Sequence, residues 1–168
     1  SEIFCFQAEN GIRDRVRARG VGEVDKRQAF EHVRERLDER TVFGVGTGST
    51  ANLFIDLLAG IRARITATVA SSEGSARRLA AHGIPVLDLN AVDGVDIYVD
   101  GADEANAQLQ LVKGGGAALT REKIVAAVAR EFLRLADHHK AGARPRGYPL
   151  PAEVKTTGGG RRRGRGRP

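Results

Sequence analysis

Short apolar runs alternate with helix-like segments from residue 25 to residue 140, and this alternation limits the fold more than any other feature. Such a pattern is typical of an α/β domain in which helices cover a mainly parallel sheet. In sheets of this kind, ligands bind beyond the carboxyl ends of the strands. Because the apolar runs are followed by polar or glycine-rich loops, these loops are the candidate functional sites.

The predicted elements define a Rossmann-like α/β fold, a mainly parallel sheet with flanking helices. Apolar runs predict strands over 41–45, 65–70, 84–87, 95–99, 109–112 and 132–136. Amphipathic spacing predicts helices over 25–39, 51–58, 73–82 and 120–129. Asp25, Ser72 and Thr120 stand where helix N-caps belong, and Gly83 stands where a helix C-terminal glycine belongs.

Composition divides the chain into three parts. Residues 1–24 have closely spaced arginines and no sustained apolar period, which predicts a flexible N-terminal extension. Residues 25–154 form the predicted α/β domain. Residues 155–168 read KTTGGGRRRGRGRP, an Arg/Gly-rich composition that predicts a disordered tail.

Charge and cysteine content exclude several classes of protein. The formal net charge of +6 comes from the six basic residues of the tail, and the rest of the chain is neutral. Nucleic-acid binding is therefore expected only through the tail. The single cysteine, Cys5, excludes a disulfide framework and a multi-cysteine metal site. No apolar run approaches the roughly 18 residues of a membrane helix and no signal peptide opens the sequence, so a cytoplasmic location is expected.

The first loop, GVGTGST at 44–50, suits a small phosphate group. Glycines let backbone amides approach an anion, and Ser49 and Thr50 add hydroxyl donors at the start of a helix. A dinucleotide motif would need glycine in place of Ser49 and an acid closing a second strand, whereas Glu73 has the spacing but opens a helix. The lysine of a nucleoside-triphosphate loop is absent. A strand-to-helix turn without a ligand is the alternative.

The second loop, DGADE at 100–104, places two aspartates directly after an apolar strand. Asp100 and Asp103 on one tight turn can face a common cleft, where they would hold sugar hydroxyls, share a proton or bind a divalent metal. A solvated Asp-Gly turn explains the same residues without any ligand.

The third loop, KGGG at 113–116, combines a lysine with three glycines. Consecutive glycines are costly in chain entropy, so they favour backbone that passes close to a substrate and offers amides to an oxyanion. Glu122 follows in the first turn of the next helix, where the helix dipole lowers a carboxyl pKa unless burial raises it. An acid that caps the helix, or that pairs with Arg121 or Lys123, is the alternative for Glu122.

The fourth loop, DHHK at 137–140, also follows a predicted strand. His138 and His139 are adjacent, so their side chains diverge, and a metal-binding pair would prefer a helical spacing of four. We interpret them as exposed loop histidines. Lys140 either reaches a phosphate or hydroxyl group or is solvated.

Together these segments resemble ribose-5-phosphate isomerase, type A. The resemblance rests on GVGTGSTA at 44–51, SSEGSARRLAAHGIPVLDLN at 71–90, DIYVDGADEANAQLQLVKGGGAALTREKIVA at 96–126, EFLRLADHHK at 131–140 and YPLPAEV at 148–154. It runs from about residue 24 to residue 154, and the order and spacing of DGADE and KGGGAALTREK are its most specific part.

The resemblance implies interconversion of ribose 5-phosphate and ribulose 5-phosphate through an enediolate, in the pentose phosphate pathway. It also implies a cytoplasmic homodimer that uses neither a metal nor a nucleotide cofactor. No membrane partner is expected, because no apolar run is long enough for a membrane helix. The substrate contacts that it implies are Lys26, Thr47, Gly48, Ser49, Thr50, Asp100, Gly101, Ala102, Asp103, Lys113, Gly114, Gly115, Gly116 and Lys140. The catalytic residues that it implies are Glu122, Asp100, Asp103 and Lys113.

Aldose–ketose isomerisation moves a proton between C2 and C1, which requires one carboxylate and donors for the developing oxyanion. Our hypothesis makes Glu122 the base, with Lys113 and the Gly114–Gly116 amides as oxyanion stabilisers. The remaining hypotheses are hydroxyl binding and ring opening by Asp100 and Asp103, and phosphate binding by Ser49, Thr50, Lys26 and Lys140.

The sequence departs from the family after Val154, where we interpret the small C-terminal α/β domain as missing and the basic tail begins. A frameshift or truncation is one explanation, and a genuine tail that binds RNA or another polyanion is the other. We expect weak or no activity of this chain and exposed apolar surface where the cover is lost. A non-catalytic sugar-phosphate-binding domain is the alternative function.

Overall fold

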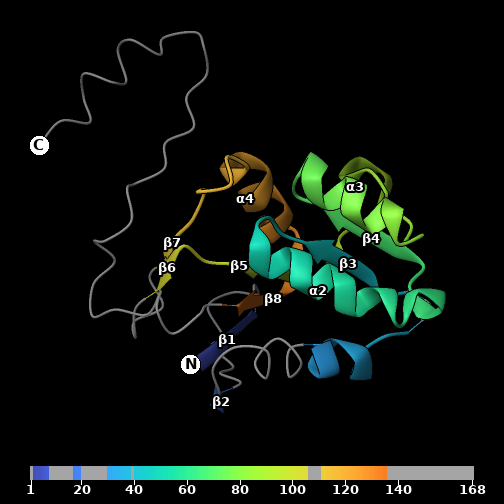
Figure 1. Cartoon of the computed structure of the whole chain (residues 1–168), viewed down its shortest axis with the longest axis horizontal. Helices are drawn as coiled ribbons and strands as arrows, with labels where there is room; N and C mark the ends of the chain where they lie inside the picture. Colours follow the sequence, from blue (N-terminus) through green and yellow to red (C-terminus); the bar gives the residue numbers. More distant parts are fainter. Residues whose placement is uncertain (1, 8–16, 20–29, 39, 106–110, 136–168) are drawn as a thin grey trace, which may run out of the picture.

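The computed structural model describes residues 2–7, 17–19, 30–38, 40–105 and 111–135, and Figure 1 shows their arrangement. The strands are β1 (Glu2–Gln7), β2 (Arg17–Arg19), β3 (Val42–Val45), β4 (Ala67–Ala70), β5 (Val95–Gly101), β6 (Glu104–Ala105), β7 (Leu111–Val112) and β8 (Ala129–Leu135). The helices are α2 (Ser49–Ala59), α3 (Glu73–Ala81) and α4 (Leu119–Ala127), with 3₁₀ turns η1 (Arg62–Arg64) and η2 (Leu89–Ala91). Residues 30–35 are also helical.

Six strands form one sheet in the order β2-β1-β8-β5-β3-β4. The four strands β8, β5, β3 and β4 run parallel, which confirms the mainly parallel α/β fold predicted from the sequence. β1 lies antiparallel to β8, and β2 lies antiparallel to β1. β6 and β7 form a separate antiparallel pair.

Helices cover both faces of the parallel strands. Successive side chains of a strand point to opposite sides, so a strand of continuous apolar residues needs cover on both faces. Ile97 and Val99 of β5 belong to one core cluster, together with Phe54 of α2. Tyr98, which stands between them, belongs to a second cluster with Val125 of α4. The central strand is therefore fixed from two sides, which holds the loops at its carboxyl end in place.

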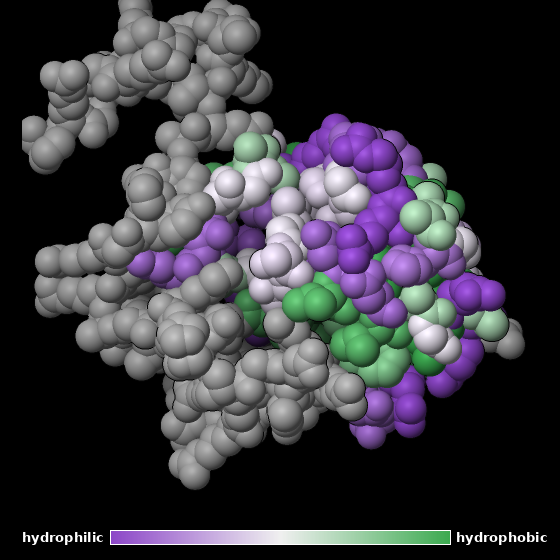
Figure 2. All heavy atoms as spheres, viewed as in Figure 1, coloured by the Kyte–Doolittle hydropathy of each residue, from purple (hydrophilic) through white to green (hydrophobic). Residues whose placement is uncertain are grey.

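The surface alternates polar and apolar regions. Figure 2 shows hydrophilic residues over α3 and apolar surface gathered over and beside α2. The large apolar side chains that are exposed among the described residues are Leu53, Leu87, Ile124 and Val128. Within the same residues, no helix combines the length and the apolar character needed to cross a membrane.

The strand predicted over 84–87 is wrong. A single parallel bridge joins Val86 to Thr68, beside β4 at the edge of the sheet. Thr68 N donates to Pro85 O over 3.1 Å, and Leu87 N donates to Thr68 O over 2.7 Å. Pro85 has no amide hydrogen to donate, so this segment does not continue the ladder. The other predicted strands are present with shifted ends, and β8 begins three residues earlier than expected, at Ala129.

Three helices begin or end elsewhere than predicted. The helix expected over 51–58 is α2, which begins two residues earlier, at Ser49. Among the described residues, the helix expected over 25–39 is helical only over 30–35, and its predicted cap Asp25 lies outside them. Thr120 is not the N-cap of α4. The N-cap is Ala118, which directly follows a turn closed by a hydrogen bond from Ala117 N to Gly114 O over 2.9 Å.

The ends of α3 follow the prediction. The Ser72 hydroxyl accepts a hydrogen bond from Ser75 N, as an N-cap does. Gly83 follows the helix with a φ of 70°, a conformation that glycine adopts without strain. Local cap chemistry was therefore sufficient to place this helix.

The first 24 residues, predicted to be a flexible extension, contribute the strands β1 and β2 next to β8. The prediction missed both strands. β1 contains a short apolar run, IFCF, that could have indicated it, whereas β2 reads RAR and gives no such signal. The domain boundaries stay predictions, and the tail 155–168 lies outside the described residues.

Candidate active site

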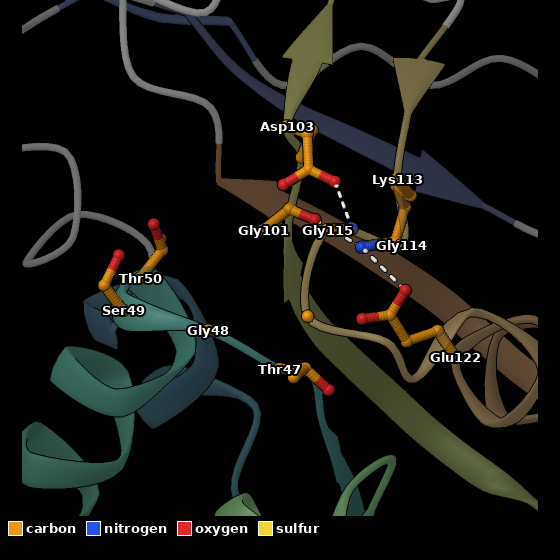
Figure 3. Close-up of a pocket in the computed structure, with 12 residues that line it drawn as sticks. Thr47, Gly48, Ser49, Thr50, Gly101, Asp103, Lys113, Gly114, Gly115 and Glu122 are labelled. Carbon is orange, nitrogen blue, oxygen red and sulfur yellow. Dashed lines mark hydrogen bonds and ion pairs between the residues drawn. The ribbon is translucent and has the colours of Figure 1, made fainter. Parts of the chain in front are cut away.

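Three of the predicted loops meet in one pocket at the carboxyl ends of β3 and β5. The pocket has a volume of about 260 Å³. Its lining consists of Thr47, Gly48, Ser49, Thr50, Gly101, Ala102, Asp103, Lys113, Gly114, Gly115, Gly116 and Glu122. Each of these residues is a site residue predicted from the sequence, and Figure 3 shows most of them around the common space.

The N-terminus of α2 forms one side of the pocket. Gly48 is the N-cap and has a φ of 97°, a left-handed conformation that suits glycine. Ser49 and Thr50 are the first residues of α2, and they lie across the pocket from Glu122 (Figure 3). A helix N-terminus offers free amide hydrogens and the positive end of the helix dipole, so this side of the pocket favours an anion.

Asp100, at the end of β5, organises the floor beneath the pocket. Its Oδ1 accepts hydrogen bonds from Gly101 N (2.7 Å) and Thr47 N (3.1 Å). Its Oδ2 accepts one from the Tyr98 hydroxyl (2.8 Å) and lies 2.7 Å from Lys113 Nζ. Asp100 is 0 % exposed, so the contact with sugar hydroxyls predicted for it would require these hydrogen bonds to rearrange.

Lys113 stands between two carboxylates. Its Nζ lies 2.7 Å from Asp100 Oδ2 and 3.5 Å from Glu122 Oε2, and it also donates to the Gly101 carbonyl. The side chain is 13 % exposed, so the ammonium is largely removed from water but still lines the pocket. Two carboxylates compensate the desolvation of this cation, which a single one would do less well.

Glu122 is a buried carboxylate at the start of α4. It is 3 % exposed, and its Oε2 accepts no hydrogen bond among the described residues. Burial raises the pKa of Glu122 and the charge of Asp100 adds to the effect, while Lys113 and the Thr47 hydroxyl oppose it. Burial, one of the two effects considered from the sequence, is therefore the largest cause of the shift. A carboxylate with a raised pKa is suited to accept and return a proton.

The Asp103 turn and the glycine loop are joined to each other. Gly115 N donates to Asp103 Oδ2 over 2.8 Å, and Asp103 N donates to Val112 O over 2.9 Å. A Cβ on Gly116 would come within 2.8 Å of Thr47 Cγ2, so any side chain there would have to displace the Thr47 methyl group where this loop passes the first one. The glycines therefore bring loops of different strands into contact.

Two buried polar residues near the site were missed by the sequence reasoning. Tyr98 lies two residues before Asp100 on the same strand, and Ser71 follows β4 with its hydroxyl 3.0 Å from that of Thr47. The period-two pattern of β5 is a signal that points to Tyr98, because residues two apart on a strand share a face. The predicted site residues Lys26 and Lys140, and the histidines His138 and His139, lie outside the described residues.

Fold and site together define an α/β protein with a buried lysine–carboxylate cluster at the carboxyl edge of a parallel sheet. Residues 67–161, more than half of the chain, match the family described as ribose 5-phosphate isomerase A (phosphoriboisomerase A). The chain belongs to this family, which confirms the resemblance seen in its sequence.

Solved structures of the family agree with this membership. Ribose 5-phosphate isomerase A from Neisseria gonorrhoeae is 44 % identical, with a TM-score of 0.64 over 71 % of this chain and 53 % of that one. A D-ribose-5-phosphate isomerase in complex with phospho-erythronic acid is 38 % identical, with a TM-score of 0.65 over 74 % and 56 %. The enzyme from Methanocaldococcus jannaschii is 34 % identical, with a TM-score of 0.64 over 73 % and 56 %. The chain thus spans about half the length of these relatives.

Proposed function

We propose that this chain carries the active site of an aldose–ketose isomerase that interconverts D-ribose 5-phosphate and D-ribulose 5-phosphate. The observation that carries the proposal is the buried Glu122 carboxylate, whose Oε2 accepts no hydrogen bond among the described residues and which lines one pocket with Lys113 and the N-terminus of α2. The family supports the choice of substrate. A relative solved with phospho-erythronic acid, a phosphorylated sugar acid, supports the same class of ligand.

The phosphate group binds at the N-terminus of α2. The free amides of the first helical turn and the hydroxyls of Ser49 and Thr50 are donors, and the helix dipole favours the negative charge there. Gly48 has no side chain and, its chain neighbours apart, no described residue comes within 4 Å of the place where a Cβ would stand, so a ligand can approach the backbone there. Lys26 and Lys140 stay predicted phosphate contacts, on the family resemblance alone.

Glu122 carries the proton. Its carboxylate takes the proton from C2 of the open-chain aldose, the C1–C2 double bond forms, and the carbonyl oxygen O1 becomes negatively charged. The same proton returns to C1 while the hydrogen of the C2 hydroxyl passes to O1, and the ketose with its carbonyl at C2 is formed. A positioned base of this kind contributes roughly 10²–10⁴ in rate.

Lys113 and the neighbouring amides stabilise the charge on O1. The ammonium lies 3.5 Å from Glu122 Oε2, so a proton-accepting group and a cation border the same part of the pocket. One such donor is worth about 3–4 kcal/mol in the transition state. Gly114 and Gly116 also line this part, where absent side chains let a ligand approach the backbone.

Asp103 binds the sugar hydroxyls and assists ring opening. One of its oxygens accepts from Gly115 N, and the residue lines the pocket, so the carboxylate is held at the ligand. Asp100 acts from beneath by fixing Lys113 and the Thr47 turn, which is a positioning role.

Conversion of ribose 5-phosphate by the 168-residue chain, followed by proton NMR at high protein concentration, tests the proposal. We expect ribulose 5-phosphate to form faster than in protein-free solution, and Glu122→Gln to slow its formation by roughly 10²–10⁴ with little change in ligand binding. Near-normal turnover of Glu122→Gln would remove this residue from the mechanism. Binding of ribose 5-phosphate by the wild-type chain without conversion would instead favour the non-catalytic sugar-phosphate-binding function.

The biological setting stays a prediction from the family. Homodimer formation, a cytoplasmic location and a place in the pentose phosphate pathway belong to it. The polyanion-binding role of the tail is also a prediction, since residues 155–168 lie outside the described part of the chain.

A further inference from the structure

A buried tyrosine beneath the pocket has no part in the chemistry described so far. Tyr98 is 0 % exposed, and its hydroxyl donates a hydrogen bond to Asp100 Oδ2 over 2.8 Å. It does not line the pocket, so it does not touch a ligand there. A buried hydroxyl that bonds to a buried carboxylate is a stronger contact than an ordinary neutral hydrogen bond.

The surroundings of Tyr98 fix the orientation of its ring. The ring packs on Phe132 of β8 with centroids 4.7 Å apart and planes tilted by 36°. On the other side, a Cβ at Gly44 would lie 2.6 Å from Tyr98 Cδ2, so β3 makes room for the ring by having no side chain there. The hydroxyl is therefore held at one place relative to Asp100.

The hydrogen bond from Tyr98 bears on Lys113 because both act on the same atom. Asp100 Oδ2 accepts from the Tyr98 hydroxyl and pairs with Lys113 Nζ at 2.7 Å. Burial and the nearby Asp100 charge raise the pKa of Tyr98, so the phenol keeps its proton and remains a donor. Two backbone amides fix Oδ1 of the same carboxylate, so the Tyr98 hydroxyl is the contact that fixes Oδ2. Without this donor, the position of Oδ2 and of the ammonium paired with it is less tightly defined.

We infer that Tyr98 is a positioning residue, which acts through Asp100 to hold the Lys113 ammonium beside Glu122, where negative charge develops on the substrate. The inference rests on the proposed function and deepens it. Lys113 then stabilises a charged intermediate without first having to reorient. The contact stabilises the negatively charged oxygen of the intermediate more than the uncharged carbonyl of the substrate, so its loss affects kcat more than KM.

Tyr98→Phe tests the inference, because it removes the hydroxyl and keeps the ring. Phospho-erythronic acid is the probe, since its carboxylate carries negative charge as the enediolate does. By isothermal titration calorimetry, we expect the affinity for this acid to fall about tenfold, equivalent to about 1.4 kcal/mol, while the affinity for ribose 5-phosphate changes less than twofold. We expect kcat to fall by a similar factor with KM unchanged.

Thr41→Val is the matched control. Thr41 is also buried, and its hydroxyl donates to Asp38 Oδ1 over 2.9 Å just before β3, at the opposite end of the strands from the pocket. This variant also loses one buried hydroxyl, so it measures the effect of lower stability alone. We expect it to leave both affinities and kcat within twofold of the wild type.

The outcomes separate the inference from the proposed function. Equal loss of affinity for both ligands, unchanged affinity for phospho-erythronic acid, or the same selective loss in Thr41→Val would overturn the positioning role. If Tyr98→Phe does not fold, Phe132→Leu replaces it, since this variant removes the ring that packs on Tyr98 but keeps the Tyr98 hydroxyl. A loss of affinity for phospho-erythronic acid but not for ribose 5-phosphate in this variant would support the positioning role. Unchanged or equally reduced affinities for the two ligands would overturn it. A wild-type chain that binds neither ligand would overturn the proposed function itself.

Discussion

Gly46 offers the sharpest test of how the site is built, through the substitution Gly46→Ala. A Cβ at this position would lie 2.0 Å from Asp100 Oδ1 and 2.5 Å from Asp100 Cβ, whereas ordinary contact begins at 3.4 Å. Neither partner is free to move away. Gly46 N donates to Val99 O over 2.8 Å, and Asp100 Oδ1 is held by two backbone amides.

The cost of Gly46→Ala follows from these contacts. Overpacking of a well-filled interior costs about 1–3 kcal/mol. Displacing Asp100 also breaks hydrogen bonds to a buried charged group, each worth about 1.5–3 kcal/mol. We therefore expect the free energy of unfolding to fall by about 3–5 kcal/mol, although Gly46 itself does not line the pocket.

Denaturant unfolding of the wild type, of Gly46→Ala and of a control variant measures this change. The control is Gly74→Ala, where the nearest atom to the new Cβ would be Ser72 Oγ at an ordinary 3.8 Å. Because Gly74 lies within α3, alanine there is expected to stabilise the chain by about 0.5–1 kcal/mol. A Gly46→Ala protein within about 1 kcal/mol of the wild type would refute the steric reasoning.

Three further predictions concern the charged groups and the helix N-terminus. Burial raises the pKa of Glu122 above its usual 4.5, so the ionised side chain destabilises the fold. At about pH 8, the Glu122→Gln variant should therefore unfold at a higher denaturant concentration than the wild type. This difference in stability should disappear below pH 4.5, where Glu122 is protonated in both the folded and the unfolded state. Lys113→Met leaves Asp100 buried without its cation and should cost about 3–5 kcal/mol in unfolding free energy; the double variant with Asp100→Asn should recover most of it, and no recovery would contradict the pairing. Ser49→Ala combined with Thr50→Ala should weaken binding of inorganic phosphate and of ribose 5-phosphate alike, by about tenfold in calorimetry; selective loss of one ligand would place the phosphate elsewhere.

Most of the pocket could be predicted from the sequence because of one property of parallel sheets. Their strands end at a common edge, so loops that follow different strands lie close together whatever the distance along the chain. Thr47 and Gly101 meet for this reason. Gly114 follows β7 of the separate β6–β7 pair, and the hydrogen bond from Gly115 N to Asp103 Oδ2 joins its loop to the end of β5. Glu122 joins them because α4 begins directly after the third loop.

The packing role of individual residues between neighbouring strands could not be predicted in the same way. Gly44 and Gly46 look like parts of an anion-binding turn, but a Cβ on either would collide with Tyr98 or Asp100 of the neighbouring strand. Such a requirement depends on strand register, and the sequence does not state which strands are neighbours. The error at 84–87 has a different cause, because Pro85 lacks the amide hydrogen with which this apolar run would extend the ladder at the edge of the sheet.

The arrangement of charge across the pocket gives it a direction. Asp103 and Glu122 lie on one side, while the other side is the electropositive start of α2 (Figure 3). On the proposed function, this polarity favours a sugar whose phosphate lies at α2, because the reverse orientation brings a dianion against two carboxylates, whose charge Lys113 offsets only in part.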